Sequence, residues 1–384
     1  MNAPRALEGL VPDWAAITAV ILGITAFAVA QGLTYPLISL VLERRGVSAS
    51  LIGLNAATFA AGLAAATLLI GRLTARAAGD KLIIAGLIGC SLCLATFAFF
   101  ESIWIWFAAR FLLGSCVGLI FMLSEAWLNV ACPDRLRGRV AGVYGAGMCA
   151  GFAAGPLAIP LFGSESGFAF ALLAVYIALI AFLTAILSRR ARTKPEPVPV
   201  GALFRFIRSA PILVGMVLAF GFADITAISA MPVYFVKTGH SESFAAISVT
   251  MMALPSAFAQ PLVGVLLDRT SRHSVAVACG FVAALSFIAI PFLHAKIAIL
   301  AVFALMGAAS FALYTCALTQ LGERYTGGLL VAGSAVFSLA YAVGSAAGST
   351  TTGFAMDLFA PAAGPISAGL VLLAFVAFMV LGRR

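Results

Sequence analysis

The chain alternates between long, continuously apolar stretches and short polar segments. Each apolar stretch is close to the length of about 20 residues that a helix needs to cross the hydrocarbon core of a bilayer. Apolar and polar residues do not alternate within the stretches, which excludes the strands of a membrane β-barrel and leaves helices. The stretches are Trp14–Val41, Leu51–Leu69, Leu82–Phe100, Trp104–Ala131, Val140–Phe162, Phe168–Leu187, Ile212–Val236, Phe244–Leu267, Val275–Leu293, Ile297–Leu321, Leu329–Met356 and Pro365–Leu381. The pattern predicts an all-α membrane protein with twelve transmembrane helices.

The overall composition agrees with a lipid environment. Hydrophobic residues make up 63% of the 384 residues and charged residues only 10%, whereas a soluble domain has roughly 25% charged residues. A soluble fold cannot bury that much apolar surface, so the excess must face lipid.

The net charge of +9 is explained by the membrane and does not indicate nucleic-acid binding. When the loops are assigned alternately to the two sides, eighteen of the 23 Lys and Arg residues fall on the side of the N-terminus. Arg44, Arg45, Lys237 and Lys296 fall on the other side, and Arg110 lies inside a predicted span. This asymmetry follows the positive-inside rule. We therefore expect a multi-pass protein of the bacterial inner (plasma) membrane with both termini in the cytoplasm.

The cysteines and histidines do not suggest a metal centre or a cofactor site. Cys90 and Cys93 form a CxxC pattern, but on an apolar helix with no second pair, so we interpret all seven cysteines as small buried hydrophobic residues. The three histidines, His240, His273 and His294, all lie in predicted loops. We expect neither a metal nor a cofactor.

The two halves of the chain repeat at a constant offset of 193 residues. At this offset Gly46, Gly71, Gly114, Gly151 and Gly155 align with Gly239, Gly264, Gly307, Gly344 and Gly348, and Arg76 aligns with Arg269. Glycines alone are weak evidence, but one constant offset with an arginine in register indicates a parallel duplication. We predict a six-helix bundle over residues 1–188, a cytoplasmic linker over 189–210, and a second six-helix bundle over 211–384. Within the linker, Phe204–Arg208 is expected either to lie on the membrane surface or to form a plain loop.

Two cytoplasmic loops carry a recognisable pattern. The loop after the eighth span, beginning at Gly264, includes Leu266, Asp268, Arg269 and Arg272 and resembles the G-x-L-x-D-R-x-G-R-R signature of major facilitators. The resemblance implies ion pairs that latch the two halves together in the outward-facing state. The loop after the second span keeps the equivalent Arg76 but has Ala75 where the acid is expected. We therefore predict a latch formed by Arg76, Asp268, Arg269 and Arg272, which depends more on the second half.

Two further segments strengthen the resemblance. Arg110 and Gly114 match the facilitator R-x-x-x-G pattern. An arginine inside a span is a functional candidate, and snorkelling to the membrane surface is the alternative. The fifth span carries Gly142, Gly151, Gly155 and Pro156, which match the first part of a signature associated with antiporters, although Ile159 and Pro160 replace its final glycines. Close helix packing at Gly151 and Gly155, with a bend at Pro156, would explain the same residues.

Polar groups at membrane depth are the candidates for proton coupling. Asp224 lies about 21 Å along the seventh span, near the midplane. Glu125 and Asn129 lie one turn apart on the fourth span and share a face. A carboxyl group in a low-dielectric environment binds and releases protons near neutral pH, so Asp224 and Glu125, with Arg110, are the proton-coupling candidates. A structural role for either acid is the alternative, for Glu125 through the Arg135–Arg139 loop.

The first helix of each facilitator half lines a central cavity, and the resemblance places substrate-binding candidates there and on neighbouring spans. These candidates are Phe27, Gln31, Tyr35, Asn129, Phe220, Phe222, Tyr314 and Tyr341. A cavity with so few charges disfavours a multiply charged substrate. The segment from Ser124 to Asn129, followed by Arg137 and Arg139, is similar to the YcaD-like branch of major facilitators.

These observations predict a monomeric secondary transporter that moves a small amphipathic organic molecule by alternating access. Export in exchange for protons is the first hypothesis, and proton-coupled uptake of a small nutrient is the second. An intramembrane enzyme would need ligands or a nucleophile with its base inside the spans, and a channel would need a repeated pore loop. The sequence suggests neither.

Overall fold

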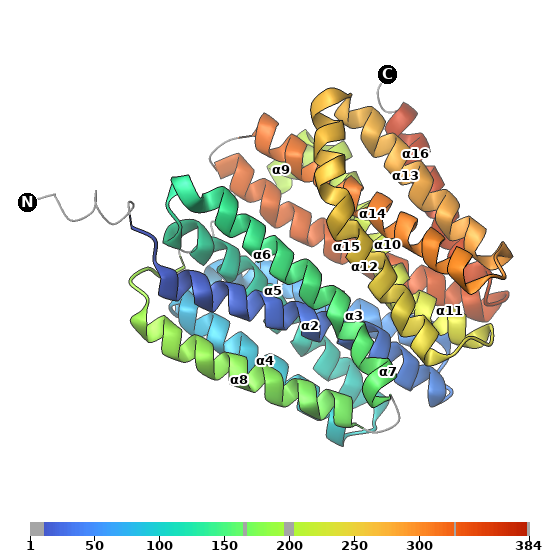
Figure 1. The fold of residues 1–384 in the computed structure, drawn as a ribbon, viewed down its shortest axis with the longest axis horizontal. Coiled ribbons are helices and arrows are strands. Elements are labelled where there is room, and N and C mark those ends of the chain that lie inside the picture. The colour runs from blue at the N-terminus through green and yellow to red at the C-terminus, as the bar shows by residue number, and fades with distance from the viewer. Residues whose placement is uncertain (1–10, 164–166, 196–202, 326–327, 382–384) are drawn as a thin grey trace, which may run out of the picture.

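The computed structural model describes residues 11–163, 167–195, 203–325 and 328–381, and within these ranges the side chains of 129, 134, 135, 137–139, 141, 142, 203–205, 260, 261, 264, 267, 268, 322 and 328–332 are left undescribed. The regular elements of this part are all helical, as the sequence predicted (Figure 1). The first half contains α2 (Trp14–Arg44), α3 (Ala49–Thr74), α4 (Gly79–Phe99), α5 (Ile103–Ala131), α6 (Asp134–Ala154), η1 (Gly155–Leu157), α7 (Ala158–Phe162) and α8 (Phe168–Arg190). The second half contains α9 (Leu203–Ser209), α10 (Pro211–Ile225), η2 (Thr226–Ala230), α11 (Met231–Lys237), α12 (Glu242–Arg269), α13 (Arg272–Ala289), η3 (Ile290–Phe292), α14 (Lys296–Arg324), α15 (Gly328–Leu358) and α16 (Ala363–Leu381).

Eleven helical segments within the described residues are long and apolar enough to cross a membrane. They correspond to the first ten predicted spans and the twelfth. The predicted span Leu329–Met356 falls within α15, which has 31 residues. Three predicted spans consist of consecutive elements: α6, η1 and α7 in the first half, and α10, η2 and α11 and then α13 and η3 in the second.

The loops that follow the first long helix of each half are built in the same way. Gly46 and Gly239 both have positive φ angles, +73° and +87°, a conformation that glycine adopts without steric cost. Two residues later, Ser48 and Ser241 accept hydrogen bonds from the backbone N–H groups of the next helix and cap α3 and α12. Residues 193 apart therefore turn the chain by the same local chemistry.

Equivalent helices also pack in equivalent pairs. In the first half α2 packs on α6 and α3 on α5, and in the second half α10 packs on α15 and α12 on α14. A Cβ atom built on Gly151 would lie 2.6 Å from the carbonyl oxygen of Thr25, and one on Gly344 would collide with that of Leu218. Gly151 and Gly344 are 193 residues apart, and so are their contact residues Thr25 and Leu218. Glycine lets the two backbones approach closely, so these residues have the packing function considered above.

Polar contacts between the two halves gather at one end of the bundle, which we call the Gly46 end. There the Asp357 carboxylate, at the end of α15, accepts hydrogen bonds from the backbone N–H groups of Ala49 and Ser50 at 3.1 and 2.6 Å. It also accepts one from the Ser50 hydroxyl at 2.5 Å. The further contacts are Arg44 with Glu242, Lys237 with Glu43, Ser39 with Ser229, and Thr250 with the carbonyl of Ala153.

At the opposite end, the Asp13 end, the start of the linker is fixed to the first half. Asp13 accepts hydrogen bonds from the backbone N–H groups of Arg192 and Thr193, at 2.7 and 2.8 Å. Partial burial raises the pKa of the Asp13 carboxyl, but hydrogen bonds from Thr193, Ala16 and Arg192 outweigh this effect and hold the pKa below its usual value. Lys194 pairs with Asp80 at 2.6 Å.

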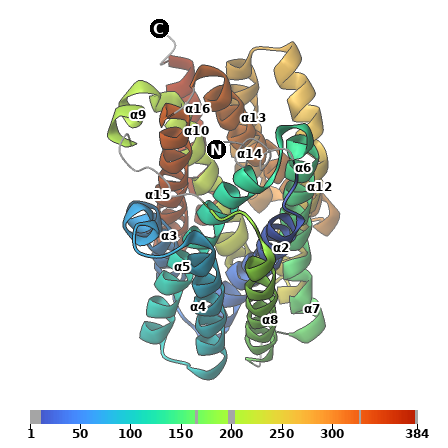
Figure 2. The same ribbon diagram turned by 90° about the vertical axis from the view of Figure 1, so that its left-hand side faces the viewer.

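The end of the linker is fixed to the second half instead. Its helix α9 packs along α15 (Figure 2). Phe206 is fully buried, with its ring 5.0 Å from that of Tyr325 and 6.3 Å from that of Phe337. The linker segment is therefore a helix whose Phe206 inserts into the second half rather than a loop or a helix that presents this ring to lipid. Residues 196–202 of the predicted linker lie outside the described part.

Candidate functional site

Asp224 is buried in the second half, where it meets a tyrosine from another helix. Its side chain is 5% exposed and accepts a hydrogen bond of 2.7 Å from the Tyr341 hydroxyl of α15. The other carboxylate oxygen has no hydrogen-bond partner among the described residues. A lone buried carboxylate is costly in an apolar environment. Within the described part, Asp224 is thus a titratable group that is held by one hydrogen bond and by no salt bridge.

A π-helical turn follows directly after this residue. The turn, η2, joins α10 to α11 and is fully buried. Its Thr226 hydroxyl lies 3.3 Å from that of Thr352 on α15, and its Ser229 hydroxyl lies 2.9 Å from that of Ser39 on α2. Such turns are frequent at functional sites because they loosen the regular backbone ladder. Here the turn connects the Asp224 segment to both halves, a feature that the sequence reading did not anticipate.

Arg110 and Tyr35 approach the same region from the first half. Arg110 is 1% exposed, and its guanidinium carbon lies 4.5 Å from the ring centre of Tyr35 and 5.2 Å from that of Phe59. Its side chain points inward, so it does not snorkel to the membrane surface. Tyr35 lies within electrostatic range of both Arg110 and Asp224, and Tyr341 within range of Asp224 and Tyr35. Side chains from α2, α5, α10 and α15 therefore form one cluster, which we call the central cluster: Tyr35, Arg110, Asp224 and Tyr341.

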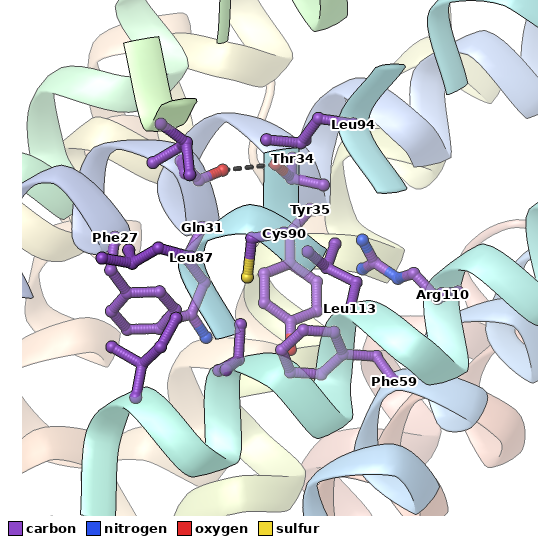
Figure 3. A pocket seen from close by; sticks show the side chains of 14 residues that line it. Phe27, Gln31, Thr34, Tyr35, Phe59, Leu87, Cys90, Leu94, Arg110 and Leu113 are labelled. Carbon is purple, nitrogen blue, oxygen red and sulfur yellow. Dashed lines mark hydrogen bonds between the residues drawn. The ribbon is translucent and has the colours of Figure 1, made fainter. Parts of the chain in front are cut away.

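A pocket with about 390 Å³ of unoccupied space adjoins the central cluster within the first half (Figure 3). Three of the predicted substrate-binding residues, Phe27, Gln31 and Tyr35, line it together with Arg110. Leu87, Leu94 and Leu113 contribute apolar surface, and Cys90 presents its sulfur. In Figure 3 the Arg110 side chain extends toward the Tyr35 ring. The pocket is thus apolar over most of its wall and carries one fixed positive charge.

Glu125 lies in a different environment from Asp224. It is exposed although it belongs to a predicted span, and Tyr144 of α6 and Tyr314 of α14 lie within its electrostatic range. Tyr144 was not among the predicted site residues, and the Tyr144 hydroxyl is buried with no hydrogen-bond partner in the described part. Glu125 therefore has one aromatic neighbour from each half.

An aromatic group on the second half connects the two acids. The ring of Phe220 lies 5.1 Å from Phe311, 5.2 Å from Tyr314 and 5.7 Å from Tyr341. Tyr314 lies within electrostatic range of Glu125, and Tyr341 donates a hydrogen bond to Asp224, so Phe220 contacts the tyrosine beside each acid. The predicted residues Phe220, Tyr314 and Tyr341 are thus brought together. Phe222 is buried against α15, where a Cβ atom on Gly348 would collide with its carbonyl oxygen.

Of the predicted latch residues, the three arginines have described side chains. Arg272 pairs with Glu323, and both residues belong to the second half. Arg76 and Arg269 are exposed. The side chains of Asp268 and Asn129 lie outside the described part. The described polar contacts that Asp357, Glu242 and Lys237 make between the halves lie at the other end of the bundle.

Comparison with known proteins connects this arrangement to a single family. The family model described as Major Facilitator Superfamily matches residues 20–349 and 220–384. An uncharacterized MFS-type transporter of Bacillus subtilis, YfkF, is 26% identical over 350 residues, covering 89% of this chain and 88% of the relative. An uncharacterized MFS-type transporter of Enterobacter sp. is 24% identical over 362 residues, covering 94% and 92%.

Solved structures show the same fold. A variant of the nucleoside transporter NupG superposes with a TM-score of 0.77 at 12% identity, covering 96% of this chain and 98% of that protein. A bacterial homolog of the human lysosomal transporter Spinster, in an inward-facing and unoccupied conformation, superposes with a TM-score of 0.74 at 15% identity, covering 95% and 94%.

Proposed function

The chain belongs to the Major Facilitator Superfamily, and from this premise we propose that it moves a small organic molecule by alternating access, coupled to protonation of Asp224. Family membership makes it a membrane transporter with many spans. We further propose a monomer of two pseudo-symmetric six-helix halves in the bacterial inner membrane. The Asp13 end, with both termini, would face the cytoplasm.

The observation that carries this proposal is the central cluster. Asp224 is buried, bonds a tyrosine of its own half, and lies within electrostatic range of Tyr35 from the other half. Adding a proton to Asp224 removes a negative charge from a poorly solvated contact between the halves. A proton shifts a conformational equilibrium when its affinity differs between the two states, and a carboxyl group at such a contact has different surroundings once the halves separate.

The contacts at the Gly46 end support an inward-facing state as the conformation described here. If that end faces away from the cytoplasm, Asp357, Glu242 and Lys237 close the outer side. The predicted latch of Arg76, Asp268, Arg269 and Arg272 would then form in the opposite state, when the Asp13 end closes.

The direction of transport has two candidates. Export in exchange for protons was suggested by the glycines of the fifth span, but equivalent glycines pack equivalently on α10 in the second half. Close packing thus explains them without reference to direction. Proton-coupled uptake is the second candidate. The charge of Arg110, which has no acidic partner among the described residues, favours it, because an anion bound there together with a proton on Asp224 leaves the site neutral.

Reconstitution tests the proposal. Proteoliposomes loaded with a pH-sensitive dye are exposed to small monocarboxylates, lipophilic amines and nucleosides, the last because NupG is a nucleoside transporter. We expect one class to drive proton movement, whose sign distinguishes uptake from export. Asp224→Asn should abolish this proton movement while preserving substrate exchange across the bilayer. Glu101→Gln, at an exposed loop residue, is the control, and intact coupling in Asp224→Asn would remove Asp224 from the mechanism.

A further inference from the structure

Arg110 is a buried cation without an anionic partner in the described part of the chain. Its Nε and Nη1 atoms are buried and form no hydrogen bond there. Its close neighbours are the ring faces of Tyr35 and Phe59. Arginine remains charged in proteins, so this site holds a full positive charge in an apolar environment.

The ring contacts compensate only part of this charge. A cation over an aromatic ring is attracted by the negative face of the ring, but the cost of removing a charge from water exceeds what such contacts return. Buried arginines therefore usually pair with a carboxylate or phosphate. The missing partner must come from outside the described residues, and Arg110 lines a pocket on the side from which such a partner could reach it.

The lining of the pocket defines what that partner looks like. None of its fourteen described lining residues is acidic, and Arg110 is the sole basic residue among them. Gln31, Thr34 and Tyr35 supply the side-chain polar groups, and most of the remaining wall is aliphatic or aromatic. One cation favours a single negative charge, and the apolar wall favours a hydrocarbon body.

We propose that this pocket is the substrate subsite of the first half, and that the cargo is a small organic monocarboxylate with an apolar body whose carboxylate binds Arg110. This inference rests on the proposed transport function and specifies its substrate class. The carboxylate accepts charge-assisted hydrogen bonds from the guanidinium, and the hydrocarbon part packs among Phe27, Leu87 and Leu113.

The charge arrangement connects this subsite to the proton. Tyr35 lies within electrostatic range of both Arg110 and Asp224. With the pocket empty and Asp224 ionised, the two charges balance. With the carboxylate bound and Asp224 protonated, they balance again. Loading the pocket while Asp224 stays ionised leaves one excess negative charge in a low-dielectric region, which is unfavourable. The anion and the proton should therefore bind together and move in the same direction.

Binding to the purified full-length protein tests the subsite directly. Phenylacetate is the probe, and phenylacetamide, which has nearly the same shape without the charge, is the comparison. We expect phenylacetate to raise the melting temperature in a saturable manner and phenylacetamide and chloride to leave it unchanged. Loss of a charge-assisted hydrogen bond predicts that Arg110→Met weakens phenylacetate binding by about 10- to 100-fold, with Arg110→Lys intermediate.

A matched control separates this effect from a general loss of charge. Arg45 also stacks on an aromatic ring, with its guanidinium 4.6 Å from the centre of Trp106, but it is exposed and lies outside the pocket. Arg45→Met should leave phenylacetate binding unchanged. Replacing a buried charge by an apolar side chain is tolerated in many proteins, and the melting temperature of unliganded Arg110→Met verifies that the variant folds.

The outcomes distinguish this inference from the proposed function. Equal binding of phenylacetate and phenylacetamide, full binding by Arg110→Met, or a chloride effect as large as that of phenylacetate would overturn the carboxylate subsite. Absence of phenylacetate binding would overturn it too, while proton movement driven by another compound and lost in Asp224→Asn would keep the proposed function. Phenylacetate binding that depends on Arg110, without movement of protons across proteoliposomes, would support the subsite and contradict the coupling.

Discussion

Asp357 offers a direct test of how the two halves are held together. Its carboxylate belongs to α15 in the second half, yet it accepts three hydrogen bonds from the first turn of α3 in the first half. These bonds can exist only while the Gly46 end is closed. Replacing Asp357 by alanine should therefore destabilise the closed arrangement relative to the one in which this end is open.

The size of the effect follows from helix capping. Loss of a capping side chain costs about 1 kcal/mol, and loss of an anion near an exposed helix N-terminus costs about 0.3–1 kcal/mol. Ser48 still caps α3 through the backbone N–H of Leu51, and Asp357 itself is exposed, so water replaces part of the loss. We expect a shift of about 1 kcal/mol, or about fivefold in the ratio of the two states.

Labelling of a buried position reports this shift. Ser229 is 1% exposed and bonds Ser39 across the two halves, so a cysteine at this position reacts only when the Gly46 end opens. We expect Asp357→Ala to raise the maleimide labelling rate of Ser229→Cys about fivefold in purified protein. Mass spectrometry of the labelled peptide distinguishes this cysteine from the seven native ones.

Asp13 supplies the matched control for this measurement. Like Asp357, it accepts several backbone hydrogen bonds at a helix start, but its partners all belong to the first half and the linker attached to it. Asp13→Ala should leave the labelling of Ser229→Cys unchanged. If Asp357→Ala folds normally and also leaves the labelling rate unchanged, the contacts at the Gly46 end do not determine the conformational balance.

Three further predictions concern single contacts. Tyr341→Phe removes the hydrogen bond to Asp224 and should slow proton-coupled transport by about tenfold. Tyr176→Phe, on α8 outside the central cluster, should leave the rate unchanged, and equal rates in the two variants would contradict the central cluster. Gly151→Ala should lower the free energy of unfolding by about 1–3 kcal/mol, because the added methyl group clashes with Thr25. Gly145 is on the same helix, but a Cβ added there has no neighbouring atom from another segment within 4 Å. Gly145→Ala should therefore be neutral or slightly stabilising in detergent melts. The pKa of Asp13 is lowered in the folded protein, so its contribution to stability is fully present above its unfolded pKa of 3.8 and disappears as the pH falls through the lowered pKa. The difference in melting temperature between wild type and Asp13→Ala should therefore be constant from pH 5 to 8 and shrink below about pH 4. A difference that persists there would argue against an ionised Asp13.

Several site residues could be predicted from the sequence because each one stands out from its immediate neighbours along the chain. Arg110 and Asp224 are conspicuous as charges within apolar stretches, and intramembrane charges are costly enough to need a reason. Gln31 and Tyr35 followed from the repeat and the family resemblance. Asp357 and Glu323 were not found, because an acid at a helix end near water is unremarkable until its partner on another helix is known. Tyr144 and the π-helical turn likewise carried no pattern that distinguishes them from packing residues.

The sequence by itself determined the helices, their approximate ends, and the register of the repeat. Lipid imposes this, because a chain in hydrocarbon must satisfy its backbone hydrogen bonds within each segment, and the apolar length of a segment is visible locally. The tertiary structure decided that Tyr35, Arg110, Asp224 and Tyr341 meet, and that the halves touch through Asp357. These outcomes depend on the rotation of each helix about its own axis. In helices that are apolar on every side, the sequence contains little information about that rotation, and close packing between distant segments fixes it.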